Sequence, residues 1–226
     1  APPRPELYVV PEWGETWAGD PDRMRADLDS LTQSHPRLWF PAYQSLGRLW
    51  ETSVESYLNR AVFPVQVDWS IPSTKLVLYA QRGQLTPIAV SANFGNRLAL
   101  DQVETKKTSI EAGRDVLPIS LTWRKLGPLG SDHRVALRLT DPNERPWASR
   151  DSLPQGGEAS FTDLETGEYL IDHHGLAIPA GTPPGDYQLR LSVRDQAGDH
   201  PLDLLDDQGQ PQGVEAILTT VQVVAP

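Results

Sequence analysis

Residues 117–123 read LPISLTW, with an apolar side chain at every second position. A period of two is typical of a β-strand with one buried face and one face in water. The same period recurs at 135–139 (VALRL), 187–193 (YQLRLSV) and 217–223 (ILTTVQV). Turn-forming sequences such as GTPPG at 181–185 separate these runs. From residue 83 onward the chain is therefore predicted to form an antiparallel, immunoglobulin-like β-sandwich.

Tyr187 stands two residues after Gly185, at the start of one of these predicted strands. A tyrosine at such a corner can donate its hydroxyl to a backbone carbonyl a few residues upstream. We expect Tyr187 to make that bond.

The first 82 residues follow a different pattern. Asp20 and Pro21 predict a helix start, because Asp caps a helix and Pro is tolerated in its first turn. Short apolar runs at 7–10, 37–40, 62–67 and 75–80 predict strands, and two amphipathic stretches near 21–34 and 50–61 predict helices. The order β-α-β-α-β-β predicts a small α/β layer of parallel strands joined by crossovers, with a final hairpin.

The expected fold class is thus α+β with two domains, residues 1–82 as the small α/β domain and residues 83–226 as the β-sandwich. The link at 81–85 is short, so the two domains are expected to share an interface.

Composition excludes several classes of protein. The 226 residues contain no Cys, so disulfides, thiolate metal sites and thiol nucleophiles are absent. Thirty acidic residues against 20 basic ones give a net charge of −10, which argues against a nucleic-acid partner. No run approaches the roughly 20 apolar residues that span a bilayer.

Motifs for chemistry are equally scarce. The sequence has no glycine-rich phosphate loop and no Gly-x-Ser-x-Gly elbow, so we predict no catalytic residue, no cofactor and no metal. The densest titratable cluster is Asp172-His173-His174. Alternation along a strand puts Asp172 and His174 on one face and His173 on the other. Asp172 and His174 are therefore candidate ligand-binding residues, and they would serve a carboxylate-dependent hydrolase in the least favoured alternative.

Aromatic residues supply the other candidates. Trp13 and Trp17 lie in a loop after the predicted strand 7–10 and could stack on a sugar ring, with Glu12 and Glu15 accepting hydroxyl hydrogen bonds. The alternative is that both indoles pack on a neighbouring helix or domain. Trp147 is a third candidate platform.

The chain as a whole resembles a known family. The carboxyl-terminal stretches that carry the resemblance are 112–123, 135–139, 151–157, 167–172 and 178–191, and the amino-terminal ones are 35–40, 54–58 and 76–79. Together they resemble the soluble carboxyl-terminal region of bacterial protein O-mannosyltransferase-like membrane glycosyltransferases, glycosyltransferase family thirty-nine. These stretches are packing and turn patterns, which are less specific than catalytic motifs.

The resemblance implies a role beside a membrane enzyme. In that family the membrane part carries the transferase site, so no catalytic residue transfers to this chain. The sequence begins APPR, without a signal peptide, which predicts an excised extracytoplasmic domain tethered through a missing N-terminal transmembrane region. The expected function is a non-catalytic accessory domain whose partners are the membrane-embedded part of its own parent chain and a glycan or acceptor protein. The main alternative is an independent carbohydrate-binding module.

Overall fold

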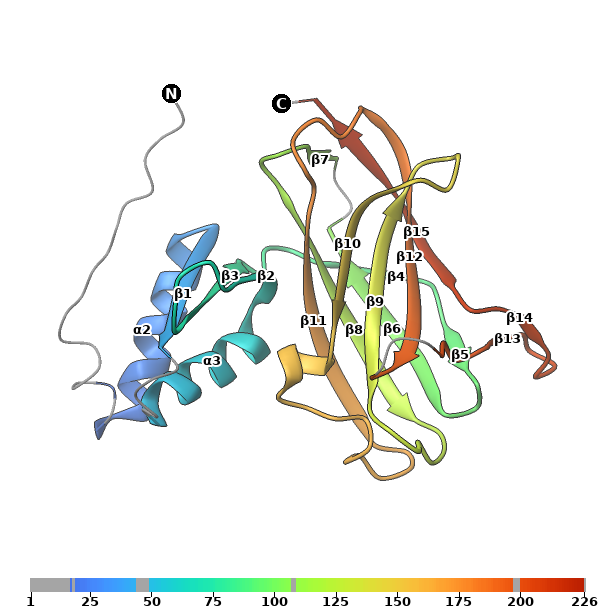
Figure 1. Ribbon diagram of the computed structural model, residues 1–226, viewed down its shortest axis with the longest axis horizontal. Coiled ribbons are helices and arrows are strands. Elements are labelled where there is room, and N and C mark those ends of the chain that lie inside the picture. The colour runs from blue at the N-terminus through green and yellow to red at the C-terminus, as the bar shows by residue number, and fades with distance from the viewer. Residues whose placement is uncertain (1–16, 18, 44–48, 107–108, 197–199, 226) are drawn as a thin grey trace.

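The computed structural model describes the whole chain except residues 1–16, 18, 44–48, 107–108, 197–199 and 226. Two parts lie side by side in Figure 1, a small helical part in blue and teal and a larger part built of long strands. The strand predicted at 7–10 lies outside the described residues. No helix among the described residues is long and apolar enough to cross a membrane.

The helices of the amino-terminal part are α2 (Pro21–Ser34) and α3 (Leu49–Ala61). The predicted start of α2 is confirmed, because the Asp20 carboxylate accepts a hydrogen bond from the Arg23 backbone N–H at 2.9 Å and Pro21 follows it. Met24 and Leu28 on one face of α2 are buried. Helix α2 therefore packs through the apolar stripe that the sequence shows.

The strands of this part are β1 (Arg37–Tyr43), β2 (Phe63–Asp68) and β3 (Thr74–Ala80). They form a sheet of order β1-β3-β2 in which both pairs are antiparallel. The prediction of directly paired parallel strands is wrong. Helix α3 does join two strands that run in the same direction, but β3 lies between them. The short turn after β2 favours local antiparallel pairing, and β3 then pairs with β1 on its other side.

The two faces of this sheet have different partners. Phe40, Val77 and Tyr79 face the helices and form one core with Met24 and Leu28. On the opposite face Phe63, Val65, Leu78 and Ala80 form a second cluster that includes Val116 of the larger part. The second cluster joins the two parts.

The larger part contains two sheets. One has the order β10-β9-β12-β15-β7, and the other has the order β11-β8-β6-β5-β13-β14, with β4 also paired to β6. Their bounds are β4 (Thr86–Ile88), β5 (Ala92–Phe94), β6 (Leu98–Thr105), β7 (Ile110–Glu111), β8 (Val116–Lys125), β9 (His133–Thr140), β10 (Pro146–Ser152), β11 (Tyr169–Ala177), β12 (Gly185–Asp195), β13 (Leu204–Leu205), β14 (Pro211–Gly213) and β15 (Ala216–Val224), with a short 3₁₀ turn, η1 (Pro154–Gly157).

This arrangement corrects the predicted fold class. The prediction of a small α/β layer followed by an immunoglobulin-like antiparallel sandwich is wrong in that form. The part of the chain that the structure describes is mostly β, and its strands form three sheets of three, five and seven strands. The two larger sheets together contain more strands than an immunoglobulin-like domain of the constant type. In addition, β15 pairs with β7 in parallel, whereas the prediction was an antiparallel sandwich. Short strands such as β7, β13 and β14 carry no two-residue period, so the sequence does not reveal them.

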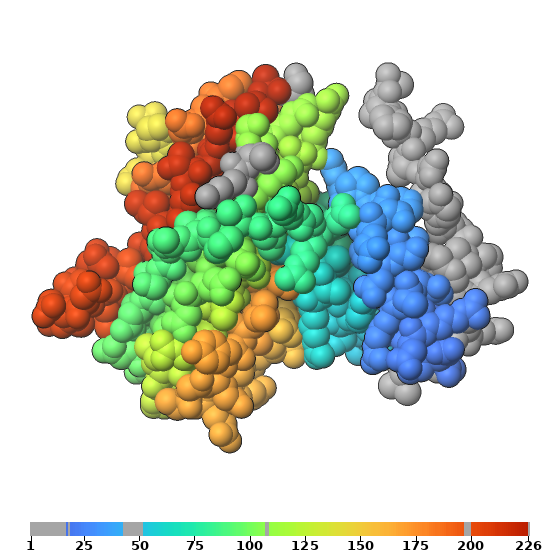
Figure 2. Space-filling view, turned by 180° about the vertical axis from the view of Figure 1, so that it is seen from behind, coloured from blue at the N-terminus to red at the C-terminus, as the bar shows by residue number. Residues whose placement is uncertain are grey.

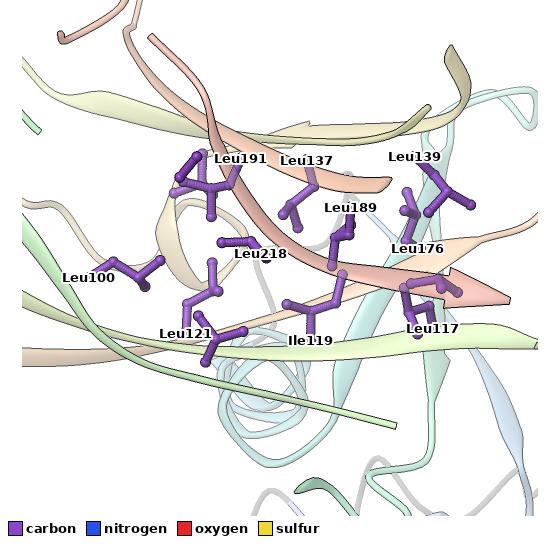
Figure 3. Close-up of a cluster of buried hydrophobic side chains, with 14 of the residues drawn as sticks. Leu100, Leu117, Ile119, Leu121, Leu137, Leu139, Leu176, Leu189, Leu191 and Leu218 are labelled. Carbon is purple, nitrogen blue, oxygen red and sulfur yellow. The ribbon is translucent and has the colours of Figure 1, made fainter. Parts of the chain in front are cut away.

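The two larger sheets pack face to face around one core. Figure 3 shows Leu137, Leu189 and Leu191 of one sheet meeting Ile119 and Leu121 of the other. All five side chains are fully buried. The alternation in 117–123, 135–139 and 187–193 thus corresponds to an inward row of side chains in β8, β9 and β12.

Strand β15 departs from the predicted phase. Opposite β12 the register skips Leu218, because Leu189 faces Thr219 and Arg190 faces Ile217. Leu218 is buried as a result, while half of the Ile217 side chain is exposed.

Tyr187 makes the predicted corner bond. Its hydroxyl donates to the Pro183 carbonyl at 2.8 Å, and its side chain is buried.

Candidate functional site

The two parts meet at an open edge of the sandwich. Strand β10 ends one large sheet and β11 ends the other, and β2 of the small sheet packs beside β11. The approach is close, because a Cβ atom added to Gly175 of β11 would lie only 2.6 Å from a methyl group of Val65 in β2. Figure 1 shows β11 as the strand of the sandwich that faces the helical part.

Asp172 and His174 lie on the inward face of β11, behind this contact. Their side chains are fully buried, and His174 Nε2 lies 2.6 Å from Asp172 Oδ2. The other carboxylate oxygen, Oδ1, accepts a hydrogen bond from the Gln155 backbone N–H at 2.8 Å. Both carboxylate oxygens of Asp172 therefore have a partner, and the predicted common face of Asp172 and His174 is confirmed.

Two residues of β10 complete the cluster at the remaining nitrogen of His174. The Nε of Arg150 and the Oγ of Ser152 each lie 3.4 Å from His174 Nδ1. A guanidinium can only donate hydrogen bonds, so Nδ1 of His174 is the acceptor from Arg150. The N–H group is then at Nε2, and it donates a hydrogen bond to Asp172 Oδ2. The contacts therefore give the two ring nitrogens of His174 different roles, Nε2 as donor and Nδ1 as acceptor.

Arg150 also connects the two parts of the molecule. One of its terminal nitrogens, Nη1, donates to the Val65 carbonyl of β2 at 2.6 Å. Burial lowers the pKa of Arg150 to about 10, although the nearby Asp172 carboxylate acts in the opposite direction. At neutral pH the guanidinium therefore stays charged between Asp172 and β2.

Ser152, His174 and Asp172 have the composition of a catalytic triad, but the contacts of His174 differ from those of a triad histidine. A triad histidine must accept the serine proton, and here Arg150 already donates to that nitrogen. Asp172 and His174 also have no exposed side-chain surface. The arrangement stabilises the sandwich edge and fixes Arg150 toward β2.

A second polar chain crosses the same boundary. The Tyr79 hydroxyl donates to Asn59 Oδ1 at 2.9 Å, and Asn59 Nδ2 donates to Glu158 Oε1 at 3.0 Å. Burial, together with the charges of Glu55 and Glu158, raises the pKa of Tyr79, so its hydroxyl keeps its proton. This chain links β3 and α3 to the loop after η1.

His173 points to the opposite side of β11 from Asp172 and His174. Its ring lies against Phe63, with 4.9 Å between the ring centroids. Burial lowers the pKa of His173 to about 4, and its Nδ1 has no hydrogen-bond partner among the described residues. The boundary between the parts therefore contains a neutral imidazole.

The predicted aromatic candidates fall in different places. Trp13, Glu12 and Glu15 lie outside the described residues. Trp17 is 4% exposed, packs in the helical core and donates its indole N–H to Asp27 at 2.9 Å. Trp147 is half-buried and donates its indole N–H to Asp141 at 3.1 Å.

A cleft lies between the two parts on the side where the linker runs. It has a volume of about 1000 Å³, at the upper end of the range for ligand pockets. Its walls come from the start of β1, the end of β3, the linker, the end of β6 and the turn between β7 and β8. Figure 2 shows the face on which the green linker passes between the blue part and the sandwich.

The sequence does not predict that basic residues gather at this cleft. Arg37, Arg82, Lys106 and Arg114 all line the cleft, although they are far apart in the chain. The pair Lys106-Lys107 is the only local signal, and the other basic residues stand singly. Only the docking of the small sheet on the sandwich brings the four together.

Comparisons with known proteins do not assign a family. No protein-family model matches the chain, and no curated protein matches it. Among solved structures the chain is similar to one titled "Putative ApaA Protein from Bordetella pertussis", with 15% sequence identity and a TM-score of 0.25. That match covers 63% of this chain and 91% of the other. The resemblance to glycosyltransferase family thirty-nine stays an expectation drawn from sequence.

Proposed function

We propose that this chain is a non-catalytic accessory module that holds a glycan, an acceptor or a partner protein beside a membrane glycosyltransferase-like part of its own parent chain. The extracytoplasmic location and the membrane tether belong to the same proposal, and they rest on the sequence resemblance. The structure supports the proposal with a cleft between the two parts.

The observation that carries the proposal is the cleft of about 1000 Å³ built jointly by the two parts. A cleft between two parts keeps its shape only if the parts are held together. Arg150 and the chain from Tyr79 through Asn59 to Glu158 supply such links. Asp172 and His174 are fully buried and do not line this cleft.

Calorimetric titration of the purified chain tests the proposal. The panel contains neutral and acidic oligosaccharides, polyprenyl-phosphate sugars and acceptor peptides. We expect at least one class to bind with a stoichiometry of one. Absence of binding across the panel would contradict the ligand-holding role.

One observation favours a second candidate, an independent carbohydrate-binding module. Trp39 and Trp69 are 45% and 53% exposed, and an exposed indole can stack on a sugar ring. Trp39 faces away from the helices, because its neighbours Leu38 and Phe40 pack against them. If this candidate is right, Trp39→Ala and Trp69→Ala weaken binding of neutral sugars without lowering the melting temperature.

The triad-like order of Ser152, His174 and Asp172 calls for a direct check of hydrolysis. We expect no turnover of ester or glycoside substrates by the wild-type chain. Activity that Ser152→Ala abolishes while the melting temperature is unchanged would contradict the non-catalytic role.

A further inference from the structure

The cleft carries positive charge in an acidic protein. Among the described residues, four basic side chains line it, from Arg37, Arg82, Lys106 and Arg114, against two acidic ones, from Glu111 and Asp115. The chain as a whole has a net charge of −10. The lining therefore has an excess of two positive charges where the rest of the surface is negative.

The two acidic residues are engaged in the turn between β7 and β8. Glu111 Oε1 accepts a hydrogen bond from Nη1 of Arg114 at 2.7 Å. Asp115 Oδ2 accepts one from the Glu111 backbone N–H at 3.0 Å. The turn itself is tight, because Gly113 has a φ of +76° and an added Cβ would lie 2.9 Å from the Ala180 side chain. These carboxylates stabilise the wall of the cleft and neutralise only part of its charge.

Arg37 has a structural role at the same place. A terminal nitrogen of Arg37 donates to the Arg114 carbonyl and so joins β1 to the turn across the cleft. Arg82 and Lys106 are different. Among the residues that the structure describes, neither the Arg82 guanidinium nor the Lys106 ammonium forms an ion pair with a carboxylate. Two cations that line the cleft are thus available to a ligand.

We infer that the cleft binds an acidic oligosaccharide, with a carboxylate or phosphate group of the ligand held by Arg82 and Lys106. A guanidinium pairs with the planar oxygens of such a group in two parallel hydrogen bonds, and an ammonium adds a point charge. The cavity volume suits a short oligosaccharide. This inference rests on the proposed binding function and names its ligand class.

Titration calorimetry on the intact chain tests the inference with three probes. An oligogalacturonate supplies carboxylates, glucose 1-phosphate supplies a phosphate, and a neutral maltooligosaccharide matches the first probe in length. We expect binding of one or both acidic probes and little or none of the neutral one. Because exposed charges are screened by salt, affinity for the acidic probe should fall as the ionic strength rises.

Charge reversal locates the site. Arg82→Glu and Lys106→Glu should each weaken binding of the acidic probe roughly tenfold or more, since each replaces a charged hydrogen-bond donor by a repelling group. Arg23→Glu on α2 makes the same change of net charge away from the cleft and should leave the affinity unchanged. Melting temperatures within a few degrees of the wild type show that the variants are folded.

Three results would overturn the inference. They are equal binding of the neutral and acidic probes, equal weakening by Arg23→Glu, and no binding of either acidic probe. If the acidic probes fail while a neutral glycan or a peptide binds, the accessory-module proposal survives and only the acidic ligand is excluded. If every probe fails, both the acidic-ligand inference and the ligand-holding role of the module are excluded.

Discussion

The buried side chain of Asp172 is expected to contribute strongly to the stability of the fold. It accepts hydrogen bonds from His174 and from the Gln155 backbone with no exposure to water. Asp172→Ala leaves both donors without a partner, so we expect it to lower the free energy of unfolding by about 3 to 5 kcal/mol in denaturant titrations. The control is Asp101→Ala, which removes a partly exposed ion pair with Arg124 and should lower the free energy of unfolding far less than Asp172→Ala does. Equal losses would contradict the structural role of Asp172.

His173 should make stability depend on pH. Its pKa is about 4 in the folded chain and 6.5 for an unperturbed histidine, so between these values the unfolded chain binds a proton that the folded chain does not. The free energy of unfolding should therefore fall by about 3 kcal/mol as the pH drops from 6.5 to 4. Asp172 opposes the lowered pKa, whereas Arg82 and His174 contribute to it.

The phenylalanine variant isolates this effect. His173→Phe keeps an aromatic ring against Phe63 and has no group that titrates. The difference in unfolding free energy between wild type and variant, measured from pH 4 to pH 7, should follow the titration of one histidine. A difference that does not change with pH would show that His173 is protonated equally in both states.

The sequence predicts some of the side-chain positions around Asp172 and His174 but not all of them. The common face of Asp172 and His174 follows from the two-residue period of one strand. Arg150 and Ser152 do not follow, because their approach depends on which edge strands of the two sheets face each other. The exposed position of Ile217 does not follow from the sequence either, because a bulge at Leu218 shifts the two-residue period of β15.

The docking of β2 on β11 depends on a residue without a side chain. At Gly175 an added Cβ would lie 2.6 Å from Val65 and 3.1 Å from Val116. We expect Gly175→Ala to cost about 1 to 3 kcal/mol of stability through overpacking, as measured by thermal or denaturant unfolding. Gly130→Ala is the control, because its added Cβ meets no atom within 4 Å, and it should change stability by about 0.5 kcal/mol or less. A cost at Gly130 as large as at Gly175 would contradict tight docking.

Elements with a clear period are predictable from this sequence. Helices α2 and α3 and strands β8, β9, β12 and β15 all occur where the apolar spacing places them. The pairing of β1, β2 and β3 is not predictable from the sequence. Two strands joined by a helix can pair directly, or a third strand can lie between them, as β3 lies between β1 and β2. The order of strands depends on long-range contacts that local spacing does not contain.

At the scale of the whole molecule, the shared polar and apolar contacts predict one cooperative unit. Hydrogen exchange should give similar unfolding free energies for the most protected amides of β3 and of β8. The small sheet and the sandwich share Val116, Arg150 and the chain from Tyr79 to Glu158, so neither should open alone. Much faster exchange throughout β3 would show that the parts separate, and the cleft would then lack a fixed shape.

The position of the bound ligand is the most direct test of whether the cleft between the two parts is the binding site. Backbone amide NMR spectra of the intact chain, recorded during titration with the oligosaccharide or peptide that binds best, identify the residues in contact with it. We expect the shifts to concentrate in the linker at 81–86, the turn between β7 and β8, and the start of β1. Shifts confined to the surroundings of Trp39 and Trp69, or an absence of shifts at saturating ligand, would contradict this expectation.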